Sequence, residues 1–367
     1  MTDREFWQFT LDVSEAGGYF RSDNFLSNET GFQYVIPELL RTTRAGGVYL
    51  GVGPEQNFTY VAALKPKMAI IFDIRRGNVL EHLLYKAIFE LSSDRADFLS
   101  RLFSRARPAG LDSTVTPDSL FRAYVAAAER PLDSARYRQN VAAVRNILVN
   151  RHGFALSDDD IGGIRYVYEA FFNGGALLNY RFGSSFNNNG GFNASFGRNG
   201  GMPTYADLMA QNDGQGVERS FLANEANFRW VKDLEARNML IPVVGDFAGA
   251  KAIRAVGKYL RDHGATVTAF YASNVEQYLF QQSDDWNKYY ANVATLPLDS
   301  SSTFIRSIGR GFRSPPGTTV PPITYTAPAP AGPYMRLPTV LCSMNGLLEA
   351  FRAGKIQGYY DVIQLSH

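Results

Sequence analysis

The sequence predicts an α/β protein with a mainly parallel sheet and a helical insertion. Apolar runs of strand length alternate with helical patterns over residues 48–90, and the alternation returns over 239–282. The order strand, helix, strand is typical of right-handed βαβ units, whose strands lie parallel in one sheet. Between these regions, residues 78–150 carry apolar side chains at the i, i+3, i+4 spacing of amphipathic helices.

Chain size and composition fit a large folded core. The 367 residues are 45% hydrophobic and 13% aromatic, and this composition excludes a disordered chain. We expect one α/β domain assembled from 1–90 and 235–367. Residues 91–234 are then an insertion, helical in its first part and rich in Gly and Asn later.

Charge and cysteine content exclude several classes of function. A net charge of +2 gives no electrostatic signature of duplex nucleic acid or an anionic membrane as partner. The single cysteine, Cys342, excludes an internal disulfide and multi-cysteine metal sites, and the four histidines form no close pair. We find neither a signal peptide nor the ~18 apolar residues of a membrane span, so we expect a cytoplasmic protein without a metal.

The first elements form the predicted βαβ unit. Residues 28–44 have the apolar spacing of a helix, in which Pro37 either weakens the pattern or marks the true start. A strand at 48–53 ends in a glycine turn, a helix follows at 57–65, and an apolar strand at 68–76 completes the unit.

Two segments later in the chain have unusual composition. Residues 173–217 are crowded with Gly and Asn, so we expect either a loop that orders over a ligand or a surface excursion. Residues 314–338 are rich in Pro, Thr and Ala and are expected to be extended. The other expected elements are strands at 239–247, 265–274 and 359–365, helices at 248–264 and 275–282, and a strand followed by a helix within 337–354.

The strongest sign of chemistry is a glycine turn followed by an acid. Gly51 and Gly53 end the first strand, and Asp73 ends the second strand about 20 residues later. Glycines let a backbone approach a ligand, and an acid at this spacing accepts hydrogen bonds from both ribose hydroxyls of a nucleoside. The alternative is structural: a tight turn and a helix cap.

Departures from known motifs narrow the range of possible cofactors. The turn reads GVGPEQN, without the third glycine of the dinucleotide motif, and no P-loop motif occurs. NAD and polyphosphate nucleotides are therefore disfavoured. A nucleoside without a polyphosphate remains, of which S-adenosylmethionine is the commonest.

The chain resembles the class I S-adenosylmethionine-dependent methyltransferases in four segments. These are YLGVGPEQN, FDIRR, PVVGDF and AFYASNVEQYL, over about 48–90 and 239–282. DNFLSNE, GVGPEQN and FDIRRGN also resemble an uncharacterised bacterial family with a methyltransferase-like domain. The resemblance implies a Rossmann-like fold of the methyltransferase type. The cofactor-binding residues that it implies are Gly51, Gly53, Pro54, Glu55, Asn57, Asp73, Ile74, Arg75, Asp246 and Phe247.

Two departures separate the chain from that pattern. Tyr49 stands where an acid usually lies two positions before the first glycine, and about 150 residues separate the second and third motifs. The first departure bears on how the methionine amino group is held, and the second on the role of Asp246.

Methyl transfer needs mainly positioning, because the sulfonium carbon is already electrophilic. The candidate catalytic residues are Tyr271 and Asn274, at the end of the fourth motif strand, with Ser273 beside them. Asn28 and Glu29 are further candidates on the acceptor side, or else a plain helix start.

Other reactive residue types have simpler interpretations. Cys342 is expected to be a small buried residue, and His82 is expected to face solvent or an interface rather than to be catalytic. Arg75 and Arg76 either hold an anion or pair with acids. The cluster Arg95, Arg101, Arg105, Arg107, Phe98 and Phe103 is expected to be a solvated helix face rather than an RNA-binding surface.

These observations lead to three hypotheses. The first is an S-adenosylmethionine-dependent methyltransferase acting on a small-molecule or unknown acceptor. The second is a non-catalytic module of the same fold that binds a nucleoside or a partner. The third is another nucleoside-using enzyme, such as a hydrolase.

Overall fold

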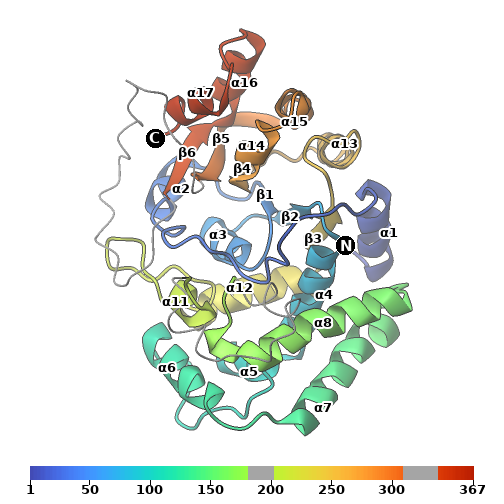
Figure 1. Ribbon diagram of the computed structural model, residues 1–367, viewed down its shortest axis with the longest axis vertical. Helices are drawn as coiled ribbons and strands as arrows, with labels where there is room; N and C mark the ends of the chain where they lie inside the picture. The colour runs from blue at the N-terminus through green and yellow to red at the C-terminus, as the bar shows by residue number, and fades with distance from the viewer. Residues whose placement is uncertain (181–201, 309–337) are drawn as a thin grey trace.

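A six-stranded sheet with the order β3-β2-β1-β4-β5-β6 forms the centre of the molecule (Figure 1). The computed structural model describes residues 1–180, 202–308 and 338–367. The strands are β1 (Val48–Val52), β2 (Met68–Asp73), β3 (Leu240–Val244), β4 (Val267–Ser273), β5 (Leu298–Ser307) and β6 (Thr339–Ser343). The mixed α/β architecture is confirmed.

Strand direction makes the sheet mostly parallel. The strands β1 to β5 all run parallel to one another, whereas β6 pairs antiparallel with β5. From β1 the order runs outward to β2 and β3 on one side, and to β4 and β5 on the other. The carboxyl ends of β1 and β4 therefore flank a topological switch point, where α/β sheets bind ligands.

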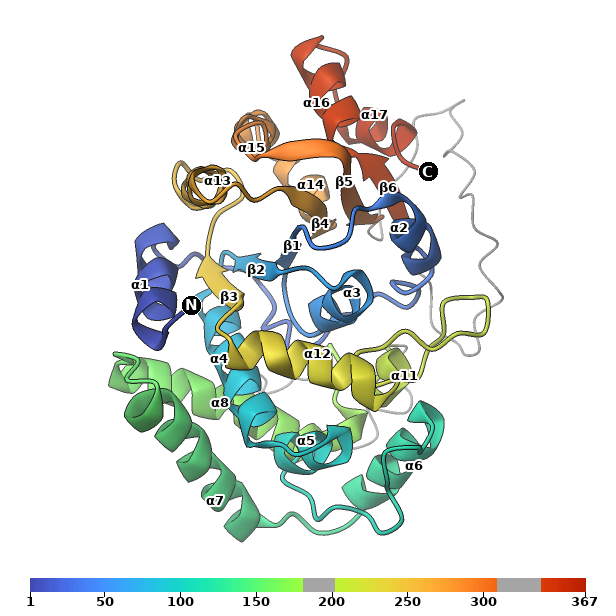
Figure 2. The same cartoon turned by 180° about the vertical axis from the view of Figure 1, so that it is seen from behind.

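Helices cover both faces of this sheet (Figures 1 and 2). The strands β1, β2 and β3 are buried along their whole length, because their near-continuous apolar residues contact helices on both sides. One face carries α3 (Gln56–Leu64), α4 (Arg76–Leu91) and α12 (Glu225–Ala236). The other carries α13 (Ala252–Asp262) and α15 (Asp285–Val293), and α1 (Asp3–Val13) lies beside β3.

The predicted helical segment lies on the outer side of α4, away from the sheet. One continuous hydrophobic core includes residues of this segment and of the sheet. Its helices are α5 (Arg95–Leu102), α6 (Pro117–Ala128), α7 (Ser134–Arg145), the π-helix Asn146–Arg151, α8 (Asp158–Gly174), the 3₁₀ turn Gly175–Leu177 and α11 (Tyr205–Met209).

The remaining helices lie near the pocket and the β6 edge of the sheet. They are α2 (Ile36–Thr42), α14 (Val275–Leu279), α16 (Met344–Arg352) and α17 (Tyr359–Gln364). No helix in the described parts of the chain is long and apolar enough to cross a membrane.

The structure decides between the two alternatives for one predicted helix, and it shows that one predicted strand was wrong. The helix expected from residue 28 begins at Ile36, with Pro37 in its first turn, so the proline marks the true start. Residues 359–365 form α17 rather than a strand. Tyr359, Val362 and Ile363 are buried at helical spacing, and the Asp361 carboxylate accepts hydrogen bonds from the backbone amides that begin the helix.

Several elements were not predicted, notably α1, α8, α12, α15 and β5. Within the predicted segment 173–217, residues 181–201 lie outside the described residues, and the flanking parts include the end of α8, the 3₁₀ turn and α11. The prediction for 314–338 falls almost wholly on 309–337, which also lie outside the described residues.

Candidate functional site

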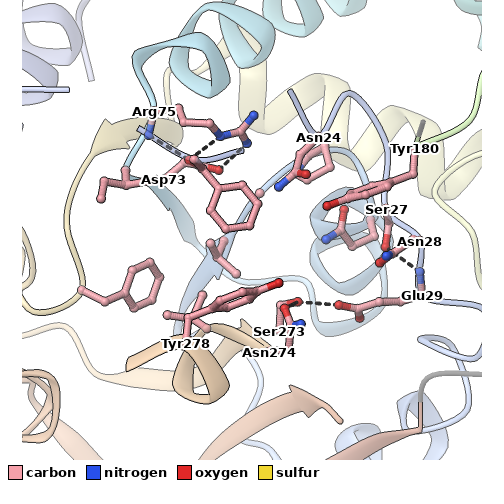
Figure 3. A pocket seen from close by; sticks show the side chains of 18 of the residues that line it. Asn24, Ser27, Asn28, Glu29, Asp73, Arg75, Tyr180, Ser273, Asn274 and Tyr278 are labelled. Carbon is pink, nitrogen blue, oxygen red and sulfur yellow. Dashed lines mark hydrogen bonds and ion pairs between the residues drawn. The ribbon is translucent and has the colours of Figure 1, made fainter. Parts of the chain in front are cut away.

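A pocket lies at the carboxyl ends of β1, β2, β3 and β4, beside the switch point (Figure 3). Its walls come from Val52–Pro54, Asp73–Arg75, Asp246–Phe247 and Ser273–Val275, and from a segment between Phe20 and Glu29. The space, including its open mouth, is about 990 Å³. The cavity itself is about 220 Å³.

The glycine turn at the end of β1 has two glycines with different roles. Gly53 has φ +79°, a backbone conformation that favours glycine, and it lines the pocket. Gly51 lies outside the lining. A Cβ on Gly51 would lie 2.0 Å from Oδ1 of Asn57, so this glycine makes room for Asn57 rather than for a ligand.

Asn57 braces the turn from behind. Its Nδ2 donates to the carbonyl oxygens of Val52, Gly53 and Pro54 at 2.9, 3.2 and 2.7 Å. Its Oδ1 accepts a hydrogen bond from the Tyr49 hydroxyl at 2.8 Å. The tyrosine that replaces the usual acid therefore supports the loop, and neither side chain lines the pocket.

At the end of β2, Asp73 is already paired. Its Oδ1 accepts hydrogen bonds from the Arg75 amide and Nε at 2.8 and 2.9 Å, and its Oδ2 accepts one from Nη2 at 2.7 Å. The side chains are 7% and 11% exposed. Arg75 Nη1 also donates to the carbonyl oxygens of Ser22 and Asp23, so it fastens the segment before the pocket to β2.

At the end of β3, Asp246 and Phe247 both line the pocket. Asp246 is exposed, and its Oδ1 accepts a hydrogen bond from the Ala248 amide. The Glu15 carboxylate accepts hydrogen bonds from the amides of Asp246, Lys251 and Ala252. It therefore occupies the amino-terminal end of α13, which in other α/β proteins binds phosphate groups.

At the end of β4, Ser273 contacts a buried acid. Its hydroxyl donates to Oε1 of Glu29 at 2.5 Å, and both residues and Asn274 line the pocket. Burial raises the pKa of Glu29, and the hydroxyls of Ser273, Ser307 and Tyr271 offset part of this effect.

Two predicted site residues lie behind the wall of the pocket. Tyr271 is fully buried, and its hydroxyl accepts a hydrogen bond from Gln56 Nε2, which belongs to a lining residue. Burial raises the pKa of this phenol well above its ordinary value, so it stays protonated. Glu55 is also buried, and burial raises its pKa to about 8.

The structure places His82 and Cys342 outside the pocket lining, and His82, expected to face solvent or an interface, is buried instead. His82 Nε2 donates to the Gly53 carbonyl at 2.9 Å, and burial lowers its pKa to about 4, so the ring is neutral near pH 7. Cys342 is buried in β6. The arginine cluster forms no solvated face, because Arg95 is buried and pairs with Glu225, while Arg101 and Arg107 pair with acids.

Sequence reasoning missed part of the lining. Asn24, Ser27, Tyr180 and Tyr278 point toward the pocket in Figure 3. The polar stretch around Asn24 and the tyrosine in the fourth motif were the available signals. Tyr180 lies within the Gly- and Asn-rich segment 173–217, for which a loop that orders over a ligand was one of the two expectations.

The fold and the pocket define an α/β protein with a pocket at the carboxyl ends of parallel strands. Comparison with models of protein families shows the family to which the chain belongs. Residues 24–116 and 119–328 match the model described as "Domain of unknown function (DUF7790)", so the chain belongs to that family. No curated protein matches the chain significantly.

Proposed function

We propose that this pocket binds S-adenosylmethionine and that the protein transfers its methyl group to an acceptor. The observation that carries the proposal is the convergence of three predicted binding segments in one pocket. The turn at Gly53, Asp73 with its neighbours, and Asp246 with Phe247 end three adjacent parallel strands. These positions suit a backbone contact, a ribose contact and an adenine contact on one nucleoside.

The strand order supports a Rossmann-like fold. The order 3-2-1-4-5-6 is that of nucleotide-binding sheets, with the ligand at the switch point between β1 and β4. The antiparallel β6 distinguishes this sheet from the fully parallel dinucleotide fold and fits the methyltransferase type that the sequence resembles.

The charges of the pocket support a ligand without a polyphosphate. Among the described lining residues, Arg75 is the one cation, and Asp73 already neutralises it. Glu29 and Asp246 add carboxyl groups, and Glu15 occupies the end of α13. Phosphate groups would meet repulsion here, whereas a sulfonium ion would be attracted.

S-adenosylmethionine, when bound, supplies an electrophilic methyl carbon. The residues of the chain would then hold the nucleoside over the Gly53 turn and keep water from the acceptor face. Asn274 and Ser273, at the end of β4, would orient the acceptor. Tyr271 would act through Gln56, because its hydroxyl lies behind the wall.

The ribose contact has a specific constraint. A carboxylate offers about four lone-pair positions, and Arg75 uses three of them on Asp73. One position therefore remains, on Oδ2. A ribose hydroxyl would take this position, and a second hydroxyl would require Arg75 to move.

Calorimetric titration tests the proposal, with S-adenosylmethionine, S-adenosylhomocysteine, adenosine and ATP as ligands. We expect the first two to bind near micromolar Kd, about 8 kcal/mol, and ATP to bind far more weakly. Asp246→Asn removes the exposed charge without breaking an ion pair, and should weaken both by several-fold. The exposed Asp12→Asn on α1, which likewise accepts one hydrogen bond and breaks no ion pair, is the matched control. Absence of binding to folded wild type contradicts the proposal.

The Asp73–Arg75 pair favours one second candidate, a non-catalytic module of the same fold. A carboxylate that serves the fold so fully has less capacity for a cofactor. Such a module would bind a nucleoside or a partner without turnover. S-adenosylmethionine binding without methyl transfer to any acceptor in a broad amine, hydroxyl and thiol panel would favour it.

A further inference from the structure

Glu29 is a buried acid in the pocket wall, and within the described parts of the chain it forms no ion pair. The residue is 3% exposed. Oε1 accepts the Ser273 hydroxyl, whereas Oε2 has no hydrogen-bond partner of normal geometry among the described residues. Arg75, the cation of the described lining, is committed to Asp73. A buried carboxyl in this state is costly unless a bound group compensates it.

Ser273 carries a second sign of function. Its φ is 50°, in the left-handed region that non-glycine residues rarely adopt. Such conformations persist where the surrounding structure enforces them, and they are concentrated at binding sites. Here the conformation ends β4 with the Ser273 hydroxyl directed at Glu29, as Figure 3 shows.

Aromatic rings line the same pocket. Phe20 and Tyr278 pack edge to face, with ring centroids 5.5 Å apart, and Tyr180 and Phe247 complete the aromatic lining. The faces of aromatic rings attract cations, and most strongly where water is excluded. Acid and rings thus favour the same kind of ligand group.

We propose that Glu29 and Ser273 form a subsite for a positively charged, sulfonium or ammonium, centre of the ligand. The inference deepens the proposed function and rests on it for the identity of the molecule that carries the charge. That charge comes either from the sulfonium of S-adenosylmethionine or from an amine acceptor. In both cases the subsite would distinguish a cation from a neutral group of the same shape.

Calorimetry with matched charged and neutral ligands tests the subsite. S-adenosylmethionine is compared with neutral-sulfur S-adenosylhomocysteine. Tetramethylammonium is compared with tert-butanol, at constant ionic strength, on the free protein and on the S-adenosylhomocysteine complex. The variants are Glu29→Gln, which keeps the shape, and Glu29→Asp, which keeps the charge. Glu349→Gln on the exposed side of α16 is the matched control.

Three outcomes support the subsite. A preference of about tenfold or more for S-adenosylmethionine over S-adenosylhomocysteine, lost in Glu29→Gln, assigns the charge to the cofactor. In the second outcome, S-adenosylmethionine and S-adenosylhomocysteine bind equally, and tetramethylammonium binds to the S-adenosylhomocysteine complex in a way that depends on Glu29. This outcome assigns the charge to the acceptor. Glu29-dependent tetramethylammonium binding without nucleoside binding keeps the subsite and removes the proposed function.

Two outcomes overturn the proposal. The first is that no charged ligand binds folded wild type more tightly than its neutral counterpart. The second is that the preference for the charged ligand persists unchanged in Glu29→Gln. Should Glu29→Gln fail to fold, Glu29→Asp and the wild-type comparison still decide the question. Glu29→Asp retains the charge and should therefore keep a preference for cations. The preference should be weaker than in wild type, because the shorter side chain places the carboxylate farther from Ser273.

Discussion

At the β2 end of the pocket the carboxylate of Asp73 accepts three hydrogen bonds from Arg75, whereas at the β4 end the Glu29 carboxylate accepts one from the described residues, donated by Ser273. The glycine turn resembles the β2 end, because Asn57 bonds to Tyr49 and to three backbone carbonyls. The β4 end combines a strained serine with a carboxylate oxygen that has no hydrogen-bond partner in the part of the chain that the structure describes.

This difference separates residues that shape the pocket from residues with capacity left for a ligand. Groups that are fully paired hold the walls in place, and their loss should appear first as a loss of stability. Groups that are buried and only partly paired carry a cost that a ligand can offset. Variants at the two ends should therefore affect different measurements.

The largest expected effect is on the paired end. Asp73→Ala leaves the Arg75 guanidinium buried without its acid, and we expect a loss of about 3 to 5 kcal/mol in the free energy of unfolding. Urea denaturation measures this loss. The double variant Asp73→Ala, Arg75→Ala should recover part of it, because it removes the unpaired charge. A single variant as stable as wild type would show that the pair does not hold this wall.

A smaller effect is expected behind the glycine turn. Asn57→Ala removes the donor to three carbonyls and the acceptor of Tyr49, so we expect a loss of about 2 to 3 kcal/mol. Tyr49→Phe removes one of these hydrogen bonds and should cost about 1 kcal/mol. Thermal unfolding of the two variants compares them. Equal losses would contradict the bracing role of Asn57.

The last effect is a pH dependence, and it concerns a buried acid outside the lining. Burial raises the pKa of Glu55 to about 8, above the ordinary value of 4.5. Between these values the unfolded chain has lost the proton that the folded chain keeps, so stability falls as pH rises, by up to about 1.4 kcal/mol per pH unit. The lowered pKa of His82 has the opposite effect, between about 4 and 6.5.

Above pH 6.5 the stability that His82 gains with rising pH is complete. The loss of stability caused by Glu55 is therefore no longer opposed by His82. Glu55→Gln should gain stability relative to wild type between pH 6.5 and 8, as measured by urea denaturation at each pH. Its ligand affinity should stay unchanged, unlike that of Glu29→Gln. A constant difference in stability across this range would exclude the raised pKa.

The sequence predicted the βαβ unit and most of the pocket for clear physical reasons. Continuous apolar runs mark the buried strands, and the ends of parallel strands meet at one edge. Gly53, Asp73, Asp246 and Asn274 consequently line one pocket despite the long insertion. The element at 359–365 was misjudged, because a short apolar stretch fits both the strand period and the helix period.

Other features depended on side chains that sequence spacing does not fix. Pairing with an acid was one of the alternatives for Arg75, and only the fold shows that the acid is Asp73. Gly51 and Asn57 matched a binding motif, yet Gly51 makes room for the Asn57 side chain and both lie outside the lining. Glu29 was either an acceptor-side candidate or a helix start; α2 begins only at Ile36, and the fold brings Glu29 to Ser273.

The most direct test of the central claim is a crystal structure of the protein grown with S-adenosylhomocysteine. We expect the nucleoside over the Gly53 turn, with its adenine beside Asp246 and Phe247, its ribose at Oδ2 of Asp73, and its sulfur directed toward Ser273. A ligand bound elsewhere, or an empty pocket at saturating concentration, would contradict the account.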